Sequence, residues 1–220
     1  MTTHFCTEIE TLKKKILALG TVVEESLRRA MKALETRDAR LARDIIDHDE
    51  EIDRMEVELE EDCLKVLALY QPVAIDLRFI VAVLKINNDL ERIGDLAVNI
   101  AQRAETLSAR ERVEISFDYL GMARKVQLML ENSLDSLVNL DVKLARKVCD
   151  TDDEVDEMHR QMFYRVQEYI RADPDQLDQY LQYLSVTRYL ERVADHSTNI
   201  AEDVIYMVEG EIVRHRLEGS

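Results

Sequence analysis

The sequence predicts an all-α protein built from two tandem, internally repeated three-helix bundles. Three observations lead to this prediction. The chain of 220 residues contains only two Pro, five Gly and no Trp, which suits long helices joined by short turns. Apolar residues recur at a spacing of three or four over long stretches, as on the buried stripe of a helix. The second half of the chain repeats motifs of the first half, which indicates two copies of one structural unit.

Six helices follow from this periodicity. The first begins at Thr7, which forms a capping-box pattern with Glu10. Pro72 and Pro174 mark breaks, because proline lacks a backbone donor and restricts the residue before it. The other helices are expected at 38–70, at 74–107, through Leu128, Leu134 and Leu137, from Asp141 through Val166, and from Leu181 to Met207. Residues 108–114 are expected to link a first bundle over 1–109 to a second over 110–220.

The repeat is clearest in a twelve-residue motif. Residues 90–101 read LERIGDLAVNIA and residues 190–201 read LERVADHSTNIA, with seven identical positions. Residues 38–43 likewise match 141–146, and residues 49–53 match 152–156. A generic solvated face has no reason to keep Glu, Asp and Asn in place while neighbouring residues change. The repeated polar residues are therefore candidates for function.

These polar residues form ridges on the predicted helices. Residues four apart share one helix face, so each copy of the motif presents two carboxylates and one amide. Each bundle adds an acidic pair from its second helix, at the same spacing of four. The ridge residues are Glu91, Asp95 and Asn99 in the first copy and Glu191, Asp195 and Asn199 in the second; the pairs are Asp49 with Asp53 and Asp152 with Asp156.

A bound cation would offset the repulsion between ionised carboxylates at this spacing. Each bundle would offer an all-oxygen shell on its outer face, where two helices present their ridges side by side. The expected cofactor is a divalent or trivalent metal ion, namely Mg, Mn, Fe or Zn, with the hard ions favoured over thiolate-loving ones. Asn99 and Asn199 are expected either to bind metal or to hydrogen-bond a ligand carboxylate. Solvated acidic faces remain the alternative for any single pair.

Charge and cysteine content indicate the compartment and the kinds of partner. The formal net charge of −16 disfavours nucleic acid and anionic membrane surfaces and suits cations. Cys6, Cys63 and Cys149 are widely spaced and are expected to be reduced thiols in a cytoplasmic protein, which excludes a zinc ribbon. Neither a signal peptide nor a membrane-spanning run is recognisable.

Other residues near the ridges have simpler interpretations. Arg92 and Arg192 are expected to bridge helices by ion pairs, and His196 to be exposed or to cap a helix. Asp156 and His159 form the only acid-x-x-His spacing, which argues against a ferritin-like di-iron centre. Motifs for nucleotide binding or nucleophilic catalysis are absent. The alternatives to a metal-binding regulator are a metal-dependent phosphohydrolase and a purely structural helical dimer.

The motifs resemble those of the PhoU family of phosphate-transport regulators. The resemblance rests on residues 90–101 and their copy, on residues 71–78 (QPVAIDLR) and on residues 152–156, and it extends from about Phe5 to Arg216. It implies a non-enzymatic negative regulator of phosphate uptake and starvation signalling, with metal clusters held by the acidic pairs. The implied partners are the ATPase of the phosphate ABC transporter and its sensor histidine kinase. A homodimer that reaches the membrane only through these partners is expected.

Overall fold

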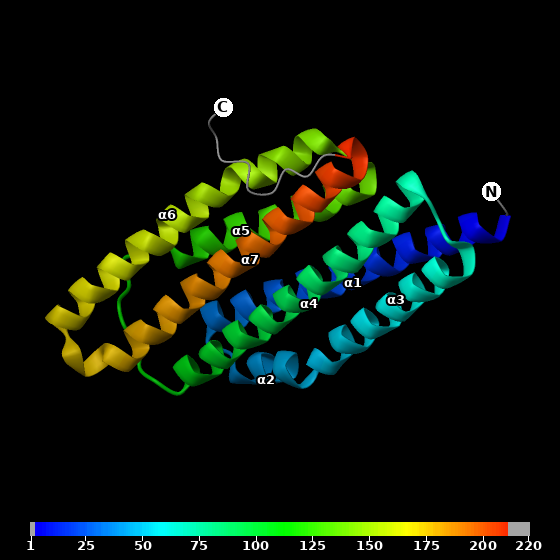
Figure 1. Ribbon diagram of the computed structural model, residues 1–220. Helices are drawn as coiled ribbons and strands as arrows, with labels where there is room; N and C mark the ends of the chain where they lie inside the picture. The colour runs from blue at the N-terminus through cyan, green and yellow to red at the C-terminus, as the bar shows by residue number, and fades with distance from the viewer. Residues whose placement is uncertain (1–2, 211–220) are drawn as a thin grey trace, which may run out of the picture.

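The computed structural model describes residues 3–210, which form long helices joined by short turns. The helices lie along one long axis, with the α3–α4 turn at one end and the α6–α7 turn at the other (Figure 1). The predicted all-α fold is confirmed. Within this range the helices are α1 (Thr3–Thr36), α2 (Ala39–Asp47), α3 (Asp49–Tyr70), α4 (Ala74–Ser108), α5 (Tyr119–Asn139), α6 (Val142–Ala172), the short 3-10 helix η1 (Pro174–Gln176) and α7 (Leu177–Glu209).

Helices α4 and α7, which carry the repeated motif, form the centre of the molecule. Helix α4 packs against α1, α2 and α3, and α7 packs against α5 and α6. The two central helices also pack against each other, and α1 contacts α5. Ile93 on α4 and Val193 on α7 are both fully buried. Buried side chains from both bundles therefore belong to one continuous core.

The apolar seam of α4, the stripe of apolar residues spaced by three or four, is buried as predicted, but two leucines named on other predicted helices are exposed. Ile86, Leu90 and Ile100 of α4 are fully buried. Leu128 on α5 and Leu181 on α7, however, are 52% and 42% exposed. A few widely spaced leucines do not define which face of a helix meets the core. On α5 the core is formed instead by Met122, Val126, Met129 and Leu130.

The helix expected over 38–70 is interrupted at His48, which separates α2 from α3. The backbone N–H of His48 donates to the Ile45 carbonyl at 3.3 Å instead of continuing the α-helical pattern. Its ring Nδ1 lies 2.6 Å from the carbonyl oxygen of Asp44, the group that the backbone N–H of a continuous helix would contact. The side chain thus takes the place of one helical hydrogen bond. The corresponding helix of the second bundle, α6, is continuous.

One repeated motif has a structural explanation. Asp38 accepts hydrogen bonds from the backbone N–H groups of Arg40 and Leu41, and Asp141 accepts the equivalent pair at the start of α6. Both are N-caps, which satisfy backbone donors left open at a helix start. The matched residues 38–43 and 141–146 therefore begin helices rather than build a site.

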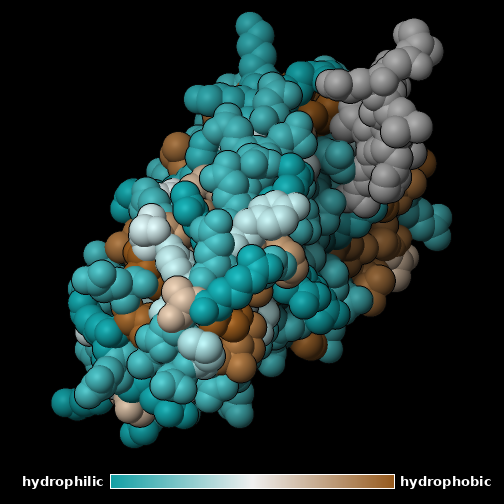
Figure 2. Space-filling view, turned by 90° about the vertical axis from the view of Figure 1, so that its left-hand side faces the viewer, coloured by the Kyte–Doolittle hydropathy of each residue, from teal (hydrophilic) through white to brown (hydrophobic). Residues whose placement is uncertain are grey.

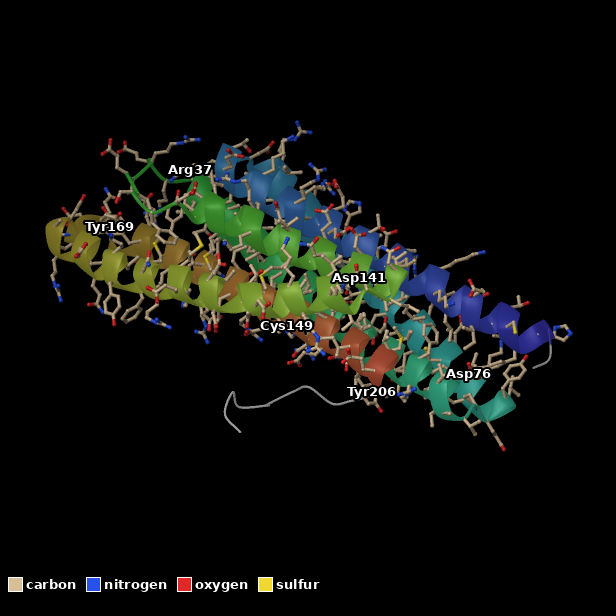
Figure 3. All side chains as sticks on the ribbon, turned by 90° about the horizontal axis from the view of Figure 1, so that it is seen from above. Arg37, Asp76, Asp141, Cys149, Tyr169 and Tyr206 are labelled. Atoms are coloured by element: carbon tan, nitrogen blue, oxygen red, sulfur yellow. The ribbon has the colours of Figure 1, made fainter. Side chains whose placement is uncertain are left out.

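Arg37 holds the segment between the two bundles in place. Its Nη1 donates to the carbonyls of Leu107 at 2.9 Å and Arg110 at 2.8 Å, and its Nη2 donates to the Tyr183 hydroxyl at 3.2 Å. Figure 3 shows Arg37 beside the connecting loop. The link between α4 and α5 covers residues 109–118, slightly longer than predicted.

The molecular surface agrees with the strong net charge. The face seen in Figure 2 is largely hydrophilic, with scattered hydrophobic groups. Among the described helices, none has the length and apolar character needed to cross a membrane.

Candidate metal centres

The four acidic residues predicted for the first site lie together where α3 runs beside α4. The pKa of Asp49 is raised by burial and then by the charges of Asp53 and Asp95. The pKa of Glu91 is raised by burial and by Asp95, with Asp53 and Glu56 adding to the shift and Arg92 opposing it. Coulombic effects of this kind require short separations. The structure therefore brings the α3 pair and the α4 ridge into one cluster.

A glycine allows these two helices to approach closely. Gly94 lies between Glu91 and Asp95, and a Cβ at this position would lie 3.0 Å from Cδ1 and 3.1 Å from Cγ2 of Ile52. At the equivalent positions the second bundle has Ala194 and Val155, both fully buried. In the second bundle the central helix thus carries the larger residue, Ala194 instead of Gly94, and the neighbouring helix carries the smaller one, Val155 instead of Ile52. The two changes compensate each other in size.

The second cluster repeats the first between α6 and α7. Burial, Asp195 and Asp156 together raise the pKa of Asp152 to about 6. The pKa of Glu191 is raised by burial, Asp195 and Asp156, and that of Asp195 by burial and Asp156. Because a raised carboxyl pKa reports an unfavourable environment for negative charge, this cluster would gain from a bound cation.

Several oxygens in the clusters are buried without a hydrogen-bond donor. They include Oδ1 of Asn87, whose residue is only 1% exposed, and Oδ1 of Asp152. Oε2 of Glu91 accepts no hydrogen bond either, although Arg92 Nε lies 3.3 Å away. Buried oxygen acceptors without donors fit a hard cation. Within residues 3–210, however, no group of three acidic, His or Cys side chains is placed to hold one ion, so binding would require side-chain rotation.

The prediction that Arg92 bridges two helices is wrong. Its guanidinium lies 3.3 Å from Glu91 and 3.5 Å from Asp95 of the same helix. It is thus a counter-charge for the α4 ridge, half-exposed to solvent. Arg192 is exposed on α7, and its charge lowers the pKa of Glu191 and Asp195.

Two motif residues of α7 serve the contact between bundles instead of the acidic cluster. His196 Nδ1 lies 2.8 Å from Oδ1 of Asp89 on α4, and Nδ2 of Asn199 donates to the same oxygen at 3.2 Å. The expectation that His196 is exposed or caps a helix is wrong, since its side chain is 18% exposed. Asn199 is likewise directed toward Asp89, whereas its counterpart Asn99 is half-buried on α4. Identical residues in the two copies therefore need not share a role.

Two further residues border the clusters. Glu56 was missed from the sequence, and His159 was noted only for its spacing from Asp156. Glu56 follows Asp53 on α3, and its charge raises the pKa of Glu91. His159 holds the equivalent position on α6, and its Nδ1 lies 3.1 Å from Oγ1 of Thr187 on α7. The same spacing of three, from Asp53, is the signal that could have revealed Glu56, because i and i+3 share a helix face.

An apolar groove lies away from both acidic clusters. It has a volume of about 620 Å³ and is lined by α1, the start of α4 and the ends of α5 and α7, including Ile9, Phe79 and Val138. It contains none of the clustered carboxylates. The acidic clusters and the apolar groove are therefore separate features.

The fold and these clusters define a duplicated helical-bundle protein with two equivalent acidic sites. The PhoU domain family matches residues 16–104 and 119–204. A PhoU homologue of Clostridium acetobutylicum, a phosphate-specific transport system accessory protein, is 36% identical over 210 residues, which cover 95% of this chain and 96% of the relative. The corresponding homologue of Pseudomonas aeruginosa is 37% identical over 217 residues, which cover 96% and 88%.

Solved structures agree with this relationship. The crystal structure of PhoU from Pseudomonas aeruginosa superimposes with a TM-score of 0.92 at 35% identity, covering 94% of this chain and all of the other. The phosphate transport system regulatory protein PhoU from Streptococcus pneumoniae gives a TM-score of 0.86 at 30% identity, covering 95% and 99%. The chain belongs to the PhoU family of phosphate-specific transport system accessory proteins. Because this is a family of regulatory and accessory proteins rather than enzymes, the phosphohydrolase alternative is set aside.

Proposed function

We propose that this PhoU protein is a negative regulator of phosphate uptake and phosphate-starvation signalling. In this proposal it connects the ATPase subunit of the phosphate ABC transporter with the sensor histidine kinase, and it does so with metal ions bound at the two acidic clusters. The proposed metal binding is supported by the duplicated carboxylate clusters, in which partly buried residues such as Glu91 and Asp152 have raised pKa values.

The charge balance of the clusters supports bound cations. In the first cluster Arg92 is the basic side chain within ion-pair distance of Glu91 and Asp95, whereas Asp49, Asp53 and Glu56 add further negative charge. Burying like charges together is unfavourable unless a counter-ion or proton compensates them. A divalent ion held by Asp49, Asp53, Glu91 and Asp95 would supply that compensation, and Asp152, Asp156, Glu191 and Asp195 would hold its counterpart.

An exposed apolar tip supports a protein partner. Residues 66–75 carry no charged side chain, although 34% of the chain is charged. At the turn between α3 and α4, Leu69, Val73 and Ile75 are 66%, 73% and 67% exposed. Gln71 and Ala74 flank this turn with φ angles of 45° and 51°, a left-handed conformation that is strained for residues other than glycine. Exposed apolar patches of this kind mark sites of protein association.

Metal analysis tests the acidic clusters. Protein purified without chelator and saturated with Mn²⁺ should lose the metal of the first cluster when Glu91→Gln is combined with Asp95→Asn. The control combines Glu51→Gln with Glu58→Gln, two exposed acids of α3, and makes the same charge change. It should keep the wild-type metal content. A double ridge variant that also keeps its full metal content would overturn the assignment.

A reporter for a starvation-induced phosphatase tests the regulatory role in cells. Deleting the gene should switch the reporter on in phosphate-rich medium, and the wild-type chain should restore repression. Val73→Ser with Ile75→Ser should fail to restore it while folding normally, because both side chains face solvent. Leu128→Ser, an exposed apolar position on α5, is the control and should repress. A reporter that stays silent after deletion contradicts negative regulation.

A further inference from the structure

The two acidic clusters differ at one position that touches both of their helices. On α3 the residue three places after Asp53 is Glu56, and on α6 the residue three places after Asp156 is His159. Both are half-buried. The potential metal ligands of the cluster between α3 and α4 are thus all oxygen atoms, whereas the cluster between α6 and α7 has an imidazole at its border.

Each of these residues contacts the central helix one turn before the ridge. Nδ2 of Asn87 donates to the backbone carbonyl of Glu56 at 2.9 Å and to its Oε1 at 3.3 Å. Nδ1 of His159 lies 3.1 Å from Oγ1 of Thr187. Asn87 precedes Glu91 by four residues, and Thr187 precedes Glu191 by four. The two contacts therefore occupy equivalent positions. The charge of Glu56 raises the pKa of Glu91, and the charge of Asp156 raises that of His159, so each variable side chain lies near a carboxylate of its own cluster.

The hydrogen bonds around Thr187 determine which ring nitrogen of His159 carries the proton. Thr187 is fully buried, and its hydroxyl donates to the Leu184 carbonyl at 2.9 Å. A hydroxyl has one proton, so Oγ1 acts as the acceptor in its longer contact with His159. Nδ1 of His159 is then the protonated nitrogen, and Nε2 keeps its lone pair.

This arrangement is the one that metal-binding histidines use. A ligating imidazole donates its other N–H to a neighbouring acceptor, which orients the ring. Burial also lowers the pKa of His159, opposed by Asp156 and aided by Arg188, so the ring favours the neutral form that a metal requires. Imidazole nitrogen suits Zn²⁺, Co²⁺ and other borderline ions, whereas carboxylates suit Mg²⁺ and Mn²⁺.

We propose that His159 makes the cluster between α6 and α7 select borderline transition ions over Mn²⁺ more strongly than the cluster between α3 and α4, where Glu56 takes its place. The inference rests on the proposed function, because it requires that both clusters bind metal. The two halves of the molecule would then differ in the metal ion that each holds.

Titration of isolated clusters tests this selectivity. Glu91→Gln with Asp95→Asn leaves the second cluster, and Glu191→Gln with Asp195→Asn leaves the first. The ratio of Mn²⁺ to Co²⁺ dissociation constants, measured by calorimetry, should be larger for the second cluster. In that background His159→Glu should remove the difference. Thr187→Val keeps the imidazole but removes its acceptor, and it should weaken Co²⁺ binding by about ten-fold. In the other background Glu56→His should raise the ratio.

Nuclear magnetic resonance of the histidine rings provides a second readout. Addition of Zn²⁺ should shift the Nε2 resonance that disappears in His159→Glu, while circular dichroism confirms that the variant is folded. If both clusters bind metal with equal ratios, or if His159→Glu leaves the ratio unchanged, the selectivity inference is wrong and the proposed metal binding stands. If neither cluster binds Mn²⁺ or Co²⁺, the proposed metal function itself fails and the inference with it.

Discussion

Asp152 should make the metal-free protein less stable at neutral pH than in mild acid. Its pKa is about 6 in the folded chain because of burial, Asp195 and Asp156, whereas an unfolded Asp titrates near pH 4. The folded state therefore binds the extra proton between these values. The stability from this proton is fully present below about pH 4 and is lost as pH rises through about 6.

The size of the effect follows from the difference of about two pKa units. Asp152→Asn preserves the shape of the side chain but cannot ionise, so it removes the cost of charging this site in the folded state. For the metal-free protein, the variant should be more stable than the wild type by up to about 3 kcal/mol at about pH 7.5, less where solvent screens the charge, and by roughly half as much at about pH 5. Between these two pH values the wild type should therefore lose about 1 kcal/mol more stability than the variant.

Urea denaturation in the presence of EDTA, followed by circular dichroism at both pH values, measures this difference. Asp150→Asn is the matched control, because Asp150 is an exposed acid of the same helix and does not contribute to the raised pKa of Asp152. Saturating Mn²⁺ should reverse the order at neutral pH, since a ligand that binds only the folded state stabilises it. If Asp152→Asn shows the same pH dependence as the wild type without metal, the reasoning about buried charge is refuted.

Three further variants test the packing around the clusters and between the bundles. Gly94→Ala should lower the free energy of unfolding by about 1 kcal/mol, because contact with Ile52 outweighs the gain in helix propensity. Urea denaturation measures this change. When Gly94→Ala is combined with Ile52→Val, the free energy of unfolding should fall by less than the sum of the two single changes. Arg37→Ala should cost about 1–2 kcal/mol and speed amide hydrogen exchange in residues 107–111 (unchanged exchange there would contradict its anchoring role). Asp89→Ala should cost about 2 kcal/mol, because it removes the acceptor of His196, while metal content stays at the wild-type level; loss of metal would place Asp89 in a metal site.

Much of the architecture was predictable because it depends on local periodicity. The fully buried residues Leu90, Ile93 and Ile100 follow the spacing of one helix face. The buried face of α4 could therefore be predicted from the sequence alone. The exposed Leu128 shows where this reasoning stops. A stripe is defined by several residues on one face, and isolated leucines leave the rotation of the helix open.

The membership of the acidic clusters was also predictable, but the orientation of their neighbours was not. The spacing of four in Glu91 and Asp95 and the duplication of the motif were sufficient to identify the ridges. Asn199 shares that spacing but is hydrogen-bonded to Asp89. No pattern within one helix reveals such a partner, because the partner is set by how α4 packs on α7.

By itself the sequence determined the helical class, the duplication, the proline breaks and the carboxylates of the two ridges. These features depend on residues close together in the chain, where helix geometry fixes which side chains share a face. The tertiary structure alone decided that His196 joins the bundles by contacting Asp89 and that His159 contacts Thr187 of α7. Those roles depend on contacts between helices far apart in sequence, and the close packing of buried side chains selects one such arrangement.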